Sequence, residues 1–334
     1  MTELHLPWLE GAILLPLLGA FWVSLAKTTD STHRRAAVIS AVTLLLAVGE
    51  ALDYAWLGSF AVHDHWDLSR GFLAWEGLVI DALSAPLVPL AALVYWVMVL
   101  ATPREKAQRF TFSGALVGES LALATLCCRQ PMVVALLLAL GALPPWLELR
   151  MRGSATRLYT AHAVVFVSFL AEGSLLLALG WPGGFWTGAG VALLAVACLL
   201  RAGVPPFHTW VMELFARATF GGAILFVAPM LGAYGVMRLC VPFASPWLIE
   251  AVATVSLLGA FYAAGLAVVQ TDARRFFASI ALSQCSMVLV GLDLGSSVGT
   301  AGALSVWLSA ALALTGLGLV LRAVEARKIG RAHV

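Results

Sequence analysis

Long apolar segments separated by short polar joints run along the whole chain. An α-helix needs about 20 apolar residues to cross the hydrocarbon core of a bilayer, and runs of that length follow one another from end to end. Their approximate ranges are 6–26, 35–58, 79–101, 110–128, 131–148, 159–180, 186–217, 221–240, 246–269, 275–293 and 299–324. In hydrocarbon every backbone amide must be bonded within the protein, so these runs are expected to be helices rather than strands. The pattern predicts an all-α, polytopic integral membrane protein with about eleven transmembrane helices.

Composition supports this class and excludes others. Of the 334 residues, 61% are hydrophobic and 11% are charged, whereas a soluble domain carries about 25% charged residues. The net charge of +2 is small and the basic residues fall between apolar segments, so we expect no nucleic-acid partner. The five cysteines are scattered and show no CxxC or Cys/His spacing. We interpret them as packing residues and predict no metal site.

The basic residues predict how the chain is oriented in the membrane. The joints after the first, third, fifth and ninth predicted helices contain Lys27, Arg34, Arg35, Arg104, Lys106, Arg109, Arg150, Arg152, Arg157, Arg274 and Arg275. The intervening joints contain few basic residues, which are Arg70, Arg129 and Arg238. Basic residues accumulate in cytoplasmic joints. We therefore predict a multi-pass protein of the cell inner (cytoplasmic) membrane with its N-terminus outside.

The seventh segment contains a predicted helix break. It is too long for one plain span and includes the sequence RAGVPPFHTW. Gly203, Pro205 and Pro206 remove backbone donors and helical preference in the middle of the run, so the helix is expected to break there. Broken membrane helices usually line a polar cavity. The alternative is a short loop that joins two ordinary helices.

Four short sequence blocks, separated along the chain, carry a resemblance to a known family. They are Gly77-Leu78-Val79-Ile80-Asp81-Ala82-Leu83-Ser84; Arg201, the break and Pro206-Phe207-His208-Thr209-Trp210; Gly232-Ala233-Tyr234-Gly235 followed by Arg238; and Gln270-Thr271-Asp272-Ala273-Arg274-Arg275 followed by Ser279 to Ser283. Together they resemble the proton-conducting antiporter-like family. This family includes the L, M and N-type subunits of NADH-quinone oxidoreductase, the Mrp antiporter subunits, and relatives in membrane hydrogenases and inorganic-carbon uptake. Within this family, the chain is most similar to a divergent complex-I-like branch. Asp81 is expected to cap the helix predicted at 79–101.

The resemblance implies a fold of fourteen helices with two inverted five-helix repeats, helices 4–8 and 9–13, each containing a broken helix. A chain with about eleven helices would hold an incomplete second repeat. We therefore divide it into three N-terminal helices (1–108), a first repeat (109–240) and a partial second repeat (241–327). The last residues, KIGRAHV (328–334), are similar to a translated sequencing-library adapter. We interpret them as a non-native tail that forms no structural element, at the end of a C-terminally truncated chain.

The resemblance also implies a row of mid-membrane Lys, Glu and His residues that carry protons through water. Three of those positions differ in this chain. The Glu of the fifth helix falls at Ala139 or Leu140, the Lys of the seventh helix is Arg201, and the Lys of the eighth helix falls on Met230. An arginine is effectively always protonated and is a poor proton shuttle. The usual row of the first repeat is therefore largely absent.

Other ionisable residues in the apolar segments are candidates for a proton or ion path. They are Glu119, His162, Glu172 and His208, together with Arg201. A charge in hydrocarbon costs at least about 2.5–3.5 kcal/mol, so each is expected to face protein or water. We predict that Arg201 points into the bundle and pairs with a carboxylate, Glu172 first and Glu119 second. Such a pair could fix helix packing rather than carry ions, and His208 could brace the helix break.

We find no nucleotide loop, flavin motif, haem-binding pair or cluster-binding cysteine set, so we expect no cofactor and no redox centre in this chain. The leading hypothesis is a membrane-arm subunit of an NADH:quinone oxidoreductase-like complex with a role in proton or cation translocation. Its expected partners are other membrane and peripheral subunits and the lipid bilayer. The alternatives are a transport-inactive scaffold subunit and a subunit of an inorganic-carbon uptake assembly.

Overall fold

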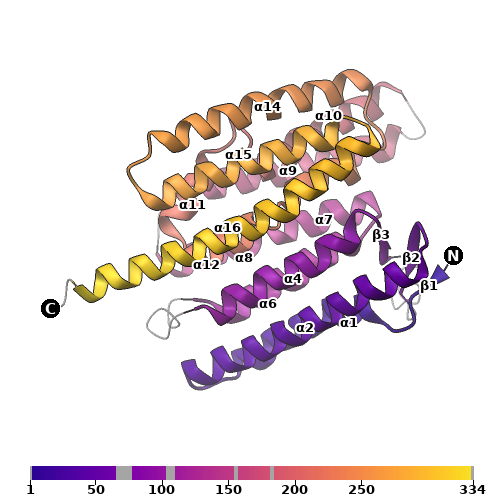
Figure 1. Ribbon diagram of the computed structural model, residues 1–334. Coiled ribbons are helices and arrows are strands. Elements are labelled where there is room, and N and C mark those ends of the chain that lie inside the picture. The colour runs from indigo at the N-terminus through magenta and orange to yellow at the C-terminus, as the bar shows by residue number, and fades with distance from the viewer. Residues whose placement is uncertain (1, 65–76, 103–109, 154–156, 181–183, 332–334) are drawn as a thin grey trace.

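The computed structural model of the protein describes residues 2–64, 77–102, 110–153, 157–180 and 184–331, and its helices lie roughly along a common direction (Figure 1). The helices of the N-terminal part are α1 (Trp8–Ser24), α2 (Thr29–Leu57), α4 (Ser84–Leu100), α6 (Phe112–Cys127), α7 (Pro131–Gly141) and α8 (Leu143–Met151). Those that follow are α9 (Arg157–Gly180), α10 (Phe185–Ala202), α11 (Thr209–Arg217), α12 (Phe220–Val227), α13 (Leu231–Gly235), the π-helix η1 (Val236–Cys240), α14 (Pro246–Val268), α15 (Ala273–Asp293) and α16 (Ser297–Arg331).

Within the described residues, 8 helical segments are long and apolar enough to cross a membrane. They are Thr29–Leu57, Pro131–Met151, Arg157–Gly180, Phe185–Ala202, Phe220–Cys240, Pro246–Val268, Ala273–Asp293 and Ser297–Val324. Shorter apolar helices cover Trp8–Ser24, Ser84–Leu100 and Phe112–Cys127. Many large apolar side chains face outward, among them Leu18, Phe261 and Val298 at 68%, 70% and 81% exposure. Such a surface fits lipid as the surrounding solvent, so the predicted polytopic helical membrane fold is confirmed, whereas the count of eleven crossings stays a prediction.

A small β-sheet lies at one end of the helix bundle. It consists of β1 (Thr2–Glu3), β2 (Ala61–His63) and β3 (Val79–Asp81) in the order β1-β2-β3. Strand β1 pairs with β2 in parallel and β2 with β3 antiparallel. The all-α prediction omitted these strands because two or three residues are too few for an alternating pattern. We call this the sheet end.

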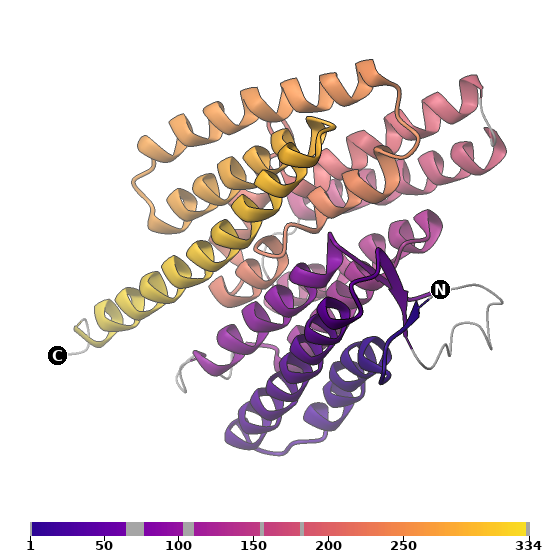
Figure 2. The same ribbon diagram turned by 45° about the vertical axis from the view of Figure 1, so that its right-hand side comes forward.

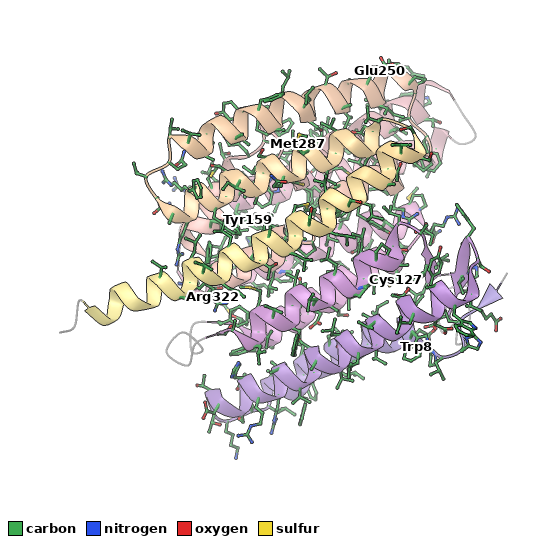
Figure 3. All side chains as sticks on the ribbon, in the orientation of Figure 1. Trp8, Cys127, Tyr159, Glu250, Met287 and Arg322 are labelled. Carbon is green, nitrogen blue, oxygen red and sulfur yellow. The ribbon has the colours of Figure 1, made fainter. Side chains whose placement is uncertain are left out.

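The opposite end carries basic residues in the turns between helices, and we call it the basic end. Lys27 follows α1, Arg152 follows α8, and Arg274 lies in the first turn of α15. Arg70, Arg104, Lys106 and Arg109, on which the predicted orientation also rests, lie outside the described part of the chain. In Figure 3, Trp8 and Cys127 lie toward the sheet end, whereas Arg322 lies toward the basic end.

The helices form two flanks with a central group between them. Helices α1, α2, α4 and α6 pack against one another, and α14, α15 and α16 form a second set. Figure 1 and Figure 2 show α1 and α2, in indigo to purple, on the opposite side of the molecule from α14, in orange, while the yellow α16 runs through the middle and packs against α4. Segments α7 to α13 connect the two and contain the interrupted helices described next.

The helix that contains Arg201 is interrupted. Helix α10 ends at Ala202, and Gly203 follows with φ of 72°, a left-handed conformation that glycine adopts without steric cost. Neither of the two prolines that follow can donate a backbone hydrogen bond, and α11 starts only at Thr209. The Trp210 indole nitrogen donates to the Leu200 carbonyl at 3.0 Å, which satisfies one of the carbonyl groups that the helix end leaves unpaired.

A second interruption lies in the segment predicted as one helix over 221–240. Helix α12 ends at Val227, and Met230 has φ of 51° before α13 begins. Pro229 supplies no backbone donor at this place, which is the physical reason for the interruption. Gly232 then lies directly against α10, because a Cβ added there would be 2.5 Å from the Ala202 nitrogen. The two interruptions therefore touch.

The last helix is longer than predicted. Helix α16 extends from Ser297 to Arg331, beyond the predicted limit of 324. Residues 328–331 continue this helix, contrary to the expectation that the KIGRAHV segment forms no structural element. Lys, Arg and Ala have high helical propensity, so a polar helix end can extend past the apolar segment.

Candidate functional site

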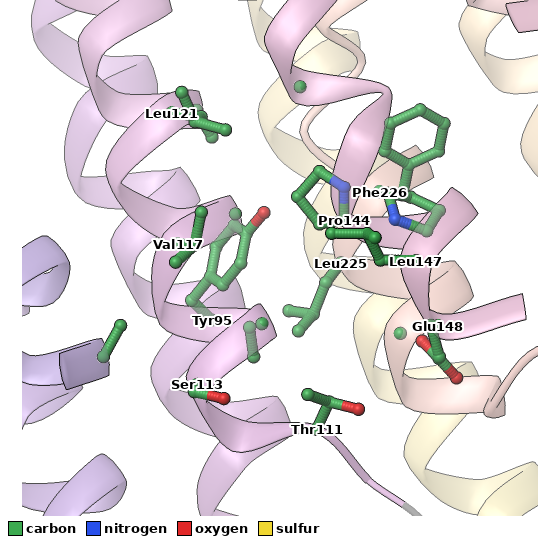
Figure 4. A pocket seen from close by; sticks show the side chains of 18 of the residues that line it. Tyr95, Thr111, Ser113, Val117, Leu121, Pro144, Leu147, Glu148, Leu225 and Phe226 are labelled. Atoms are coloured by element: carbon green, nitrogen blue, oxygen red, sulfur yellow. The ribbon is translucent and has the colours of Figure 1, made fainter. Parts of the chain in front are cut away.

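A cavity leads from the basic end toward the middle of the bundle (Figure 4). Its volume is about 490 Å³, and α1, α4, α6, α8 and α12 contribute to its walls. Thr111, Ser113 and Glu148 lie at its basic-end side, while Tyr95 and Arg201 line it deeper in the bundle. Most of the other lining residues are apolar. The cavity thus places a few polar groups in series within an otherwise apolar wall.

Arg201 lies at the deep part of this cavity, at the end of α10. Its side chain is buried, and its Nη2 donates a hydrogen bond of 3.1 Å to the Phe226 carbonyl. The guanidinium carbon lies 3.6 Å from the centre of the Phe226 ring, a cation–π contact. The Nε atom has no hydrogen-bond partner in the described structure. A separate void of about 10 Å³ beside Arg201, Trp210 and Met230 is near the smallest size that holds one water molecule.

The predicted ion pair of Arg201 was wrong. Within the described residues, neither Glu172 nor Glu119 forms a salt bridge with it, and a backbone carbonyl takes the place of the carboxylate. Glu172 is exposed. It lies off the face of α9 that packs inward, which is formed by Tyr159, His162, Phe166, Leu170, Gly173 and Leu177.

Glu119 is the candidate carboxyl that the structure places deep in the protein. It lies halfway along α6 and is 0% exposed. One carboxyl oxygen accepts a hydrogen bond of 2.7 Å from the Ser40 hydroxyl of α2, and the other oxygen has no partner. Tyr95 interacts electrostatically with both Glu119 and Arg201, and its hydroxyl lies beside Gly118. Tyr95 therefore connects the carboxyl to the wall of the cavity.

The two histidines lie in different surroundings. The ring of His162 stacks on Trp210 with 4.1 Å between ring centres, and its Nδ1 atom has no partner. His208 stands at the start of α11, partly buried, with its ring 5.3 Å from that of Tyr262. Neither histidine lines the cavity, and Glu119 does not line it either. Arg201 interacts electrostatically with both Tyr95 and His162, and Tyr95 interacts with Glu119.

A largely buried ion pair at the sheet end, in which Arg238 is partly exposed, was not predicted from the sequence. Arg238 binds Asp81 through two hydrogen-bonded contacts of 2.7 and 2.8 Å, and its Nε donates to the Tyr234 hydroxyl at 2.9 Å. Tyr234 in turn donates to the Leu126 carbonyl at 2.8 Å. Asp81 also accepts from the backbone nitrogens of Leu83 and Ser84 at 3.1 and 3.0 Å. The N-cap residue of α4 is Leu83, so Asp81 lies two residues before the cap position.

This network joins two of the four sequence blocks, the one that enters α4 and the one that follows α12. The signal for the pair was present in the sequence, since both charged residues stand at the sheet end of apolar segments. Burial alone raises the pKa of Asp81, but the contacts from Arg238 and Ser84 outweigh it and hold the pKa below its ordinary value. Asp81 is therefore ionised and structural.

Comparison with known proteins identifies relatives of the chain. Residues 184–331 match the family described as NADH:quinone oxidoreductase/Mrp antiporter, TM. The chain is 29% identical to NAD(P)H-quinone oxidoreductase chain 4 1 of Synechococcus elongatus, over 95% of this chain and 65% of the relative. It is 25% identical to the chloroplastic NAD(P)H-quinone oxidoreductase chain 4 of Chara vulgaris, over 89% of this chain and 66% of the relative. The chain thus spans just under two thirds of the length of these curated relatives.

Solved structures share the fold. A chain of respiratory complex I from Thermus thermophilus aligns with a TM-score of 0.75 at 20% identity, over 93% of this chain and 70% of that one. A chain of the archaeal membrane-bound sulfane sulfur reductase aligns with a TM-score of 0.79 at 19% identity, over 93% of this chain and 55% of that one. A chain of the Mrp complex from Dietzia sp. aligns with a TM-score of 0.77 at 17% identity, over 95% of this chain and 65% of that one. The family resemblance found in the four sequence blocks is confirmed, and residues 184–331 are the part of the chain that matches the NADH:quinone oxidoreductase/Mrp antiporter family.

Proposed function

We propose that the protein is a membrane-arm subunit of an NADH:quinone oxidoreductase-like complex and that it takes part in proton translocation. The observation that carries this proposal is the cavity that leads from the basic end to Arg201 and Tyr95, beside the buried carboxyl of Glu119. The names of the relatives support the type of complex. We also propose that the protein assembles with other subunits of such a complex. Its basic end faces the cytoplasm and its N-terminus faces the outside.

The roles follow from the chemistry of the side chains. Arg201 keeps its positive charge and supplies a fixed field at the deep part of the cavity. Glu119 is the group that gains and loses the proton, since a carboxyl exchanges protons when water reaches it. Tyr95 lines the cavity and interacts electrostatically with both groups. Glu119 thus takes over the protonatable role that the resemblance assigns to positions occupied here by Ala139 or Leu140 and by Met230.

We expect Glu119→Gln to reduce proton flux by about tenfold or more, because the amide keeps the shape of the side chain but cannot exchange a proton. The measurement is proton uptake into proteoliposomes that contain the assembled complex. Glu250→Gln is the matched control, since Glu250 is exposed on α14 and is expected to leave the flux unchanged.

The alternative is a transport-inactive scaffold subunit. The hydrogen bond of Arg201 to the Phe226 carbonyl favours it, because that bond fixes the contact of α10 with α12 without any carboxylate. Wild-type flux in Glu119→Gln, with the complex fully assembled, would support the scaffold and contradict the proton path.

The finer architecture is proposed on the same grounds. All eleven apolar segments cross the bilayer, with three N-terminal helices up to residue 108, a first repeat over 109–240 and part of an inverted second repeat over 241–327. The two interruptions between α10 and α13 lie within the first repeat. This agrees with the expectation that broken helices line the polar site of a transporter repeat.

A further inference from the structure

One face of α2 carries buried polar residues through the apolar part of the bundle. Ser40, Thr43 and Glu50 are each 0% exposed, and the buried Ala47 lies between the last two. Positions 40, 43, 47 and 50 share one side of an α-helix. Ser40 already donates to Glu119 on α6, so this face begins at the carboxyl of the proposed proton path.

Glu50 ends this polar face near the sheet end. Neither of its carboxyl oxygens has a hydrogen-bond partner in the described structure. Two further carboxylates, Asp53 and Asp64, act on it electrostatically, and it acts in turn on Tyr54 and on Cys127 of α6. No cation is among the groups recorded around Glu50 within the described residues.

The neighbouring acids differ from Glu50 in being held by donors. The side chain of Asp53 accepts hydrogen bonds from the His5 backbone nitrogen at 2.8 Å and from the Trp8 indole at 2.9 Å. Asp64 accepts from the Glu10 backbone nitrogen at 2.8 Å. Figure 3 shows Trp8 and Cys127, which flank this region, toward the sheet end. Glu50 is thus a fully buried carboxyl without donors, close to two carboxyls that accept hydrogen bonds.

A buried carboxyl without donors is stable only in its neutral, protonated form, because removing an unpaired charge from water costs many kcal/mol. Nearby negative charges act in the same direction. Glu50 therefore holds a proton, whereas hydrogen bonds from His5 and Trp8 favour the ionised form of Asp53. The Cβ atoms of residues three apart on a helix are neighbours, so Asp53 lies next to Glu50.

Asp53 connects this region to the surface. Its Oδ1 contacts the Nδ1 of His5, whose side chain is 64% exposed. In the other direction, Glu50 is ten residues from Ser40, about 15 Å along the helix axis. Thr43 supplies a hydroxyl on the way, which donates to the Ile39 carbonyl at 3.0 Å, and Ala47 is the small residue between Thr43 and Glu50.

We propose that Glu50 is a proton-binding site that receives protons from Glu119 along the polar face of α2 and releases them at the sheet end through Asp53 and His5. The inference rests on the proposed translocation function. It assigns the sheet-end half of the path to the N-terminal helices, outside residues 184–331 that match the family. The proton is carried by carboxyl and imidazole groups, and no bond other than O–H and N–H forms or breaks.

The test uses Glu50→Gln in the assembled complex, with Glu250→Gln as the control. Infrared difference spectroscopy across a pH titration is expected to show the band of a protonated carboxylic acid in the wild type and in the control, and its loss in Glu50→Gln. Proton flux in proteoliposomes is expected to fall by about tenfold or more in Glu50→Gln only. Glu50→Asp, which restores a carboxyl, is expected to recover part of the flux.

Two results would overturn the inference. One is an unchanged carboxylic-acid band in Glu50→Gln, which would place that proton elsewhere. The other is wild-type flux in Glu50→Gln while Glu119→Gln is inactive, which would contradict the α2 route and leave the proposed function intact. If both glutamine variants keep wild-type flux, the translocation function itself fails.

Discussion

Buried charged residues in this protein fall into two groups that differ in their partners. Asp81 and Arg238 satisfy each other at the sheet end with two contacts, and Tyr234 completes the network. The carboxyls of Glu50 and Glu119 each keep at least one oxygen without any donor. Fully satisfied groups stabilise one arrangement, whereas unsatisfied ones can change their protonation at smaller structural cost. The first group is structural and the second is where proton exchange is expected.

Arg238→Met is expected to lower the free energy of unfolding by about 3–5 kcal/mol, because it leaves the buried Asp81 carboxylate without its counter-charge. Since the pKa of Asp81 is held low in the folded protein, the stabilisation is present above the ordinary carboxyl pKa and is lost as the pH falls through the lowered one. The difference between variant and wild type should therefore shrink below about pH 4.

The measurement is thermal unfolding of the purified chain in detergent at several pH values. Arg34→Met is the control, because Arg34 is exposed near the start of α2. Equal destabilisation by the two variants at neutral pH would show that the Asp81 pair adds nothing specific.

At the scale of helices, the sequence predicted those features that depend on the length of apolar segments and on the positions of prolines. The interruption after Ala202 lies where Gly203 and two prolines stand together, and a regular helix cannot contain all three. The interruption before Leu231 was missed, because Pro229 stands alone in an apolar run and a single proline can also be accommodated by a kink. Its consequence, the left-handed Met230, depends on the packing of α13 against α10.

Gly232→Ala tests whether the contact between the two interruptions is as tight as described. The new Cβ would lie 2.5 Å from the backbone nitrogen and 2.8 Å from the Cα of Ala202, so α10 or α13 must move. We expect a loss of about 1–3 kcal/mol of stability. Thermal unfolding in detergent measures it, and Gly265→Ala in α14, with nothing within 4 Å of the added carbon, is the control. A stability of Gly232→Ala equal to that of the control would argue against the contact.

At the scale of the whole molecule, the membrane fold could be predicted because apolar length and basic joints report directly on the bilayer. The candidate site could be predicted only in part. The inward position of Arg201 follows from its cost in lipid, but its partner depends on how α6, α9 and α10 are rotated. That rotation turns Glu172 outward and places the Phe226 carbonyl within 3.1 Å, which no spacing in the sequence indicates.

The proposed orientation can be tested with two cysteine variants. The five native cysteines are buried, so labelling by a membrane-impermeant maleimide starts from a low background. Thr271→Cys at the basic end is expected to react only when the cytoplasmic side is accessible, and Ser245→Cys at the sheet end only from outside. Both positions are exposed. The opposite pattern, with both proteins folded, would invert the proposed topology and with it the direction of the path.

The contact of Gly232 with Ala202 has a consequence for how sequences of this type can diverge. The two residues belong to different interrupted helices, yet the backbone of one fills the space that a side chain at the other would need. A larger residue at either position can be accepted only if the helices separate. Substitutions at the two positions should therefore be correlated and restricted to small residues. An alignment of related sequences is expected to show covariation between these positions, which are 30 residues apart.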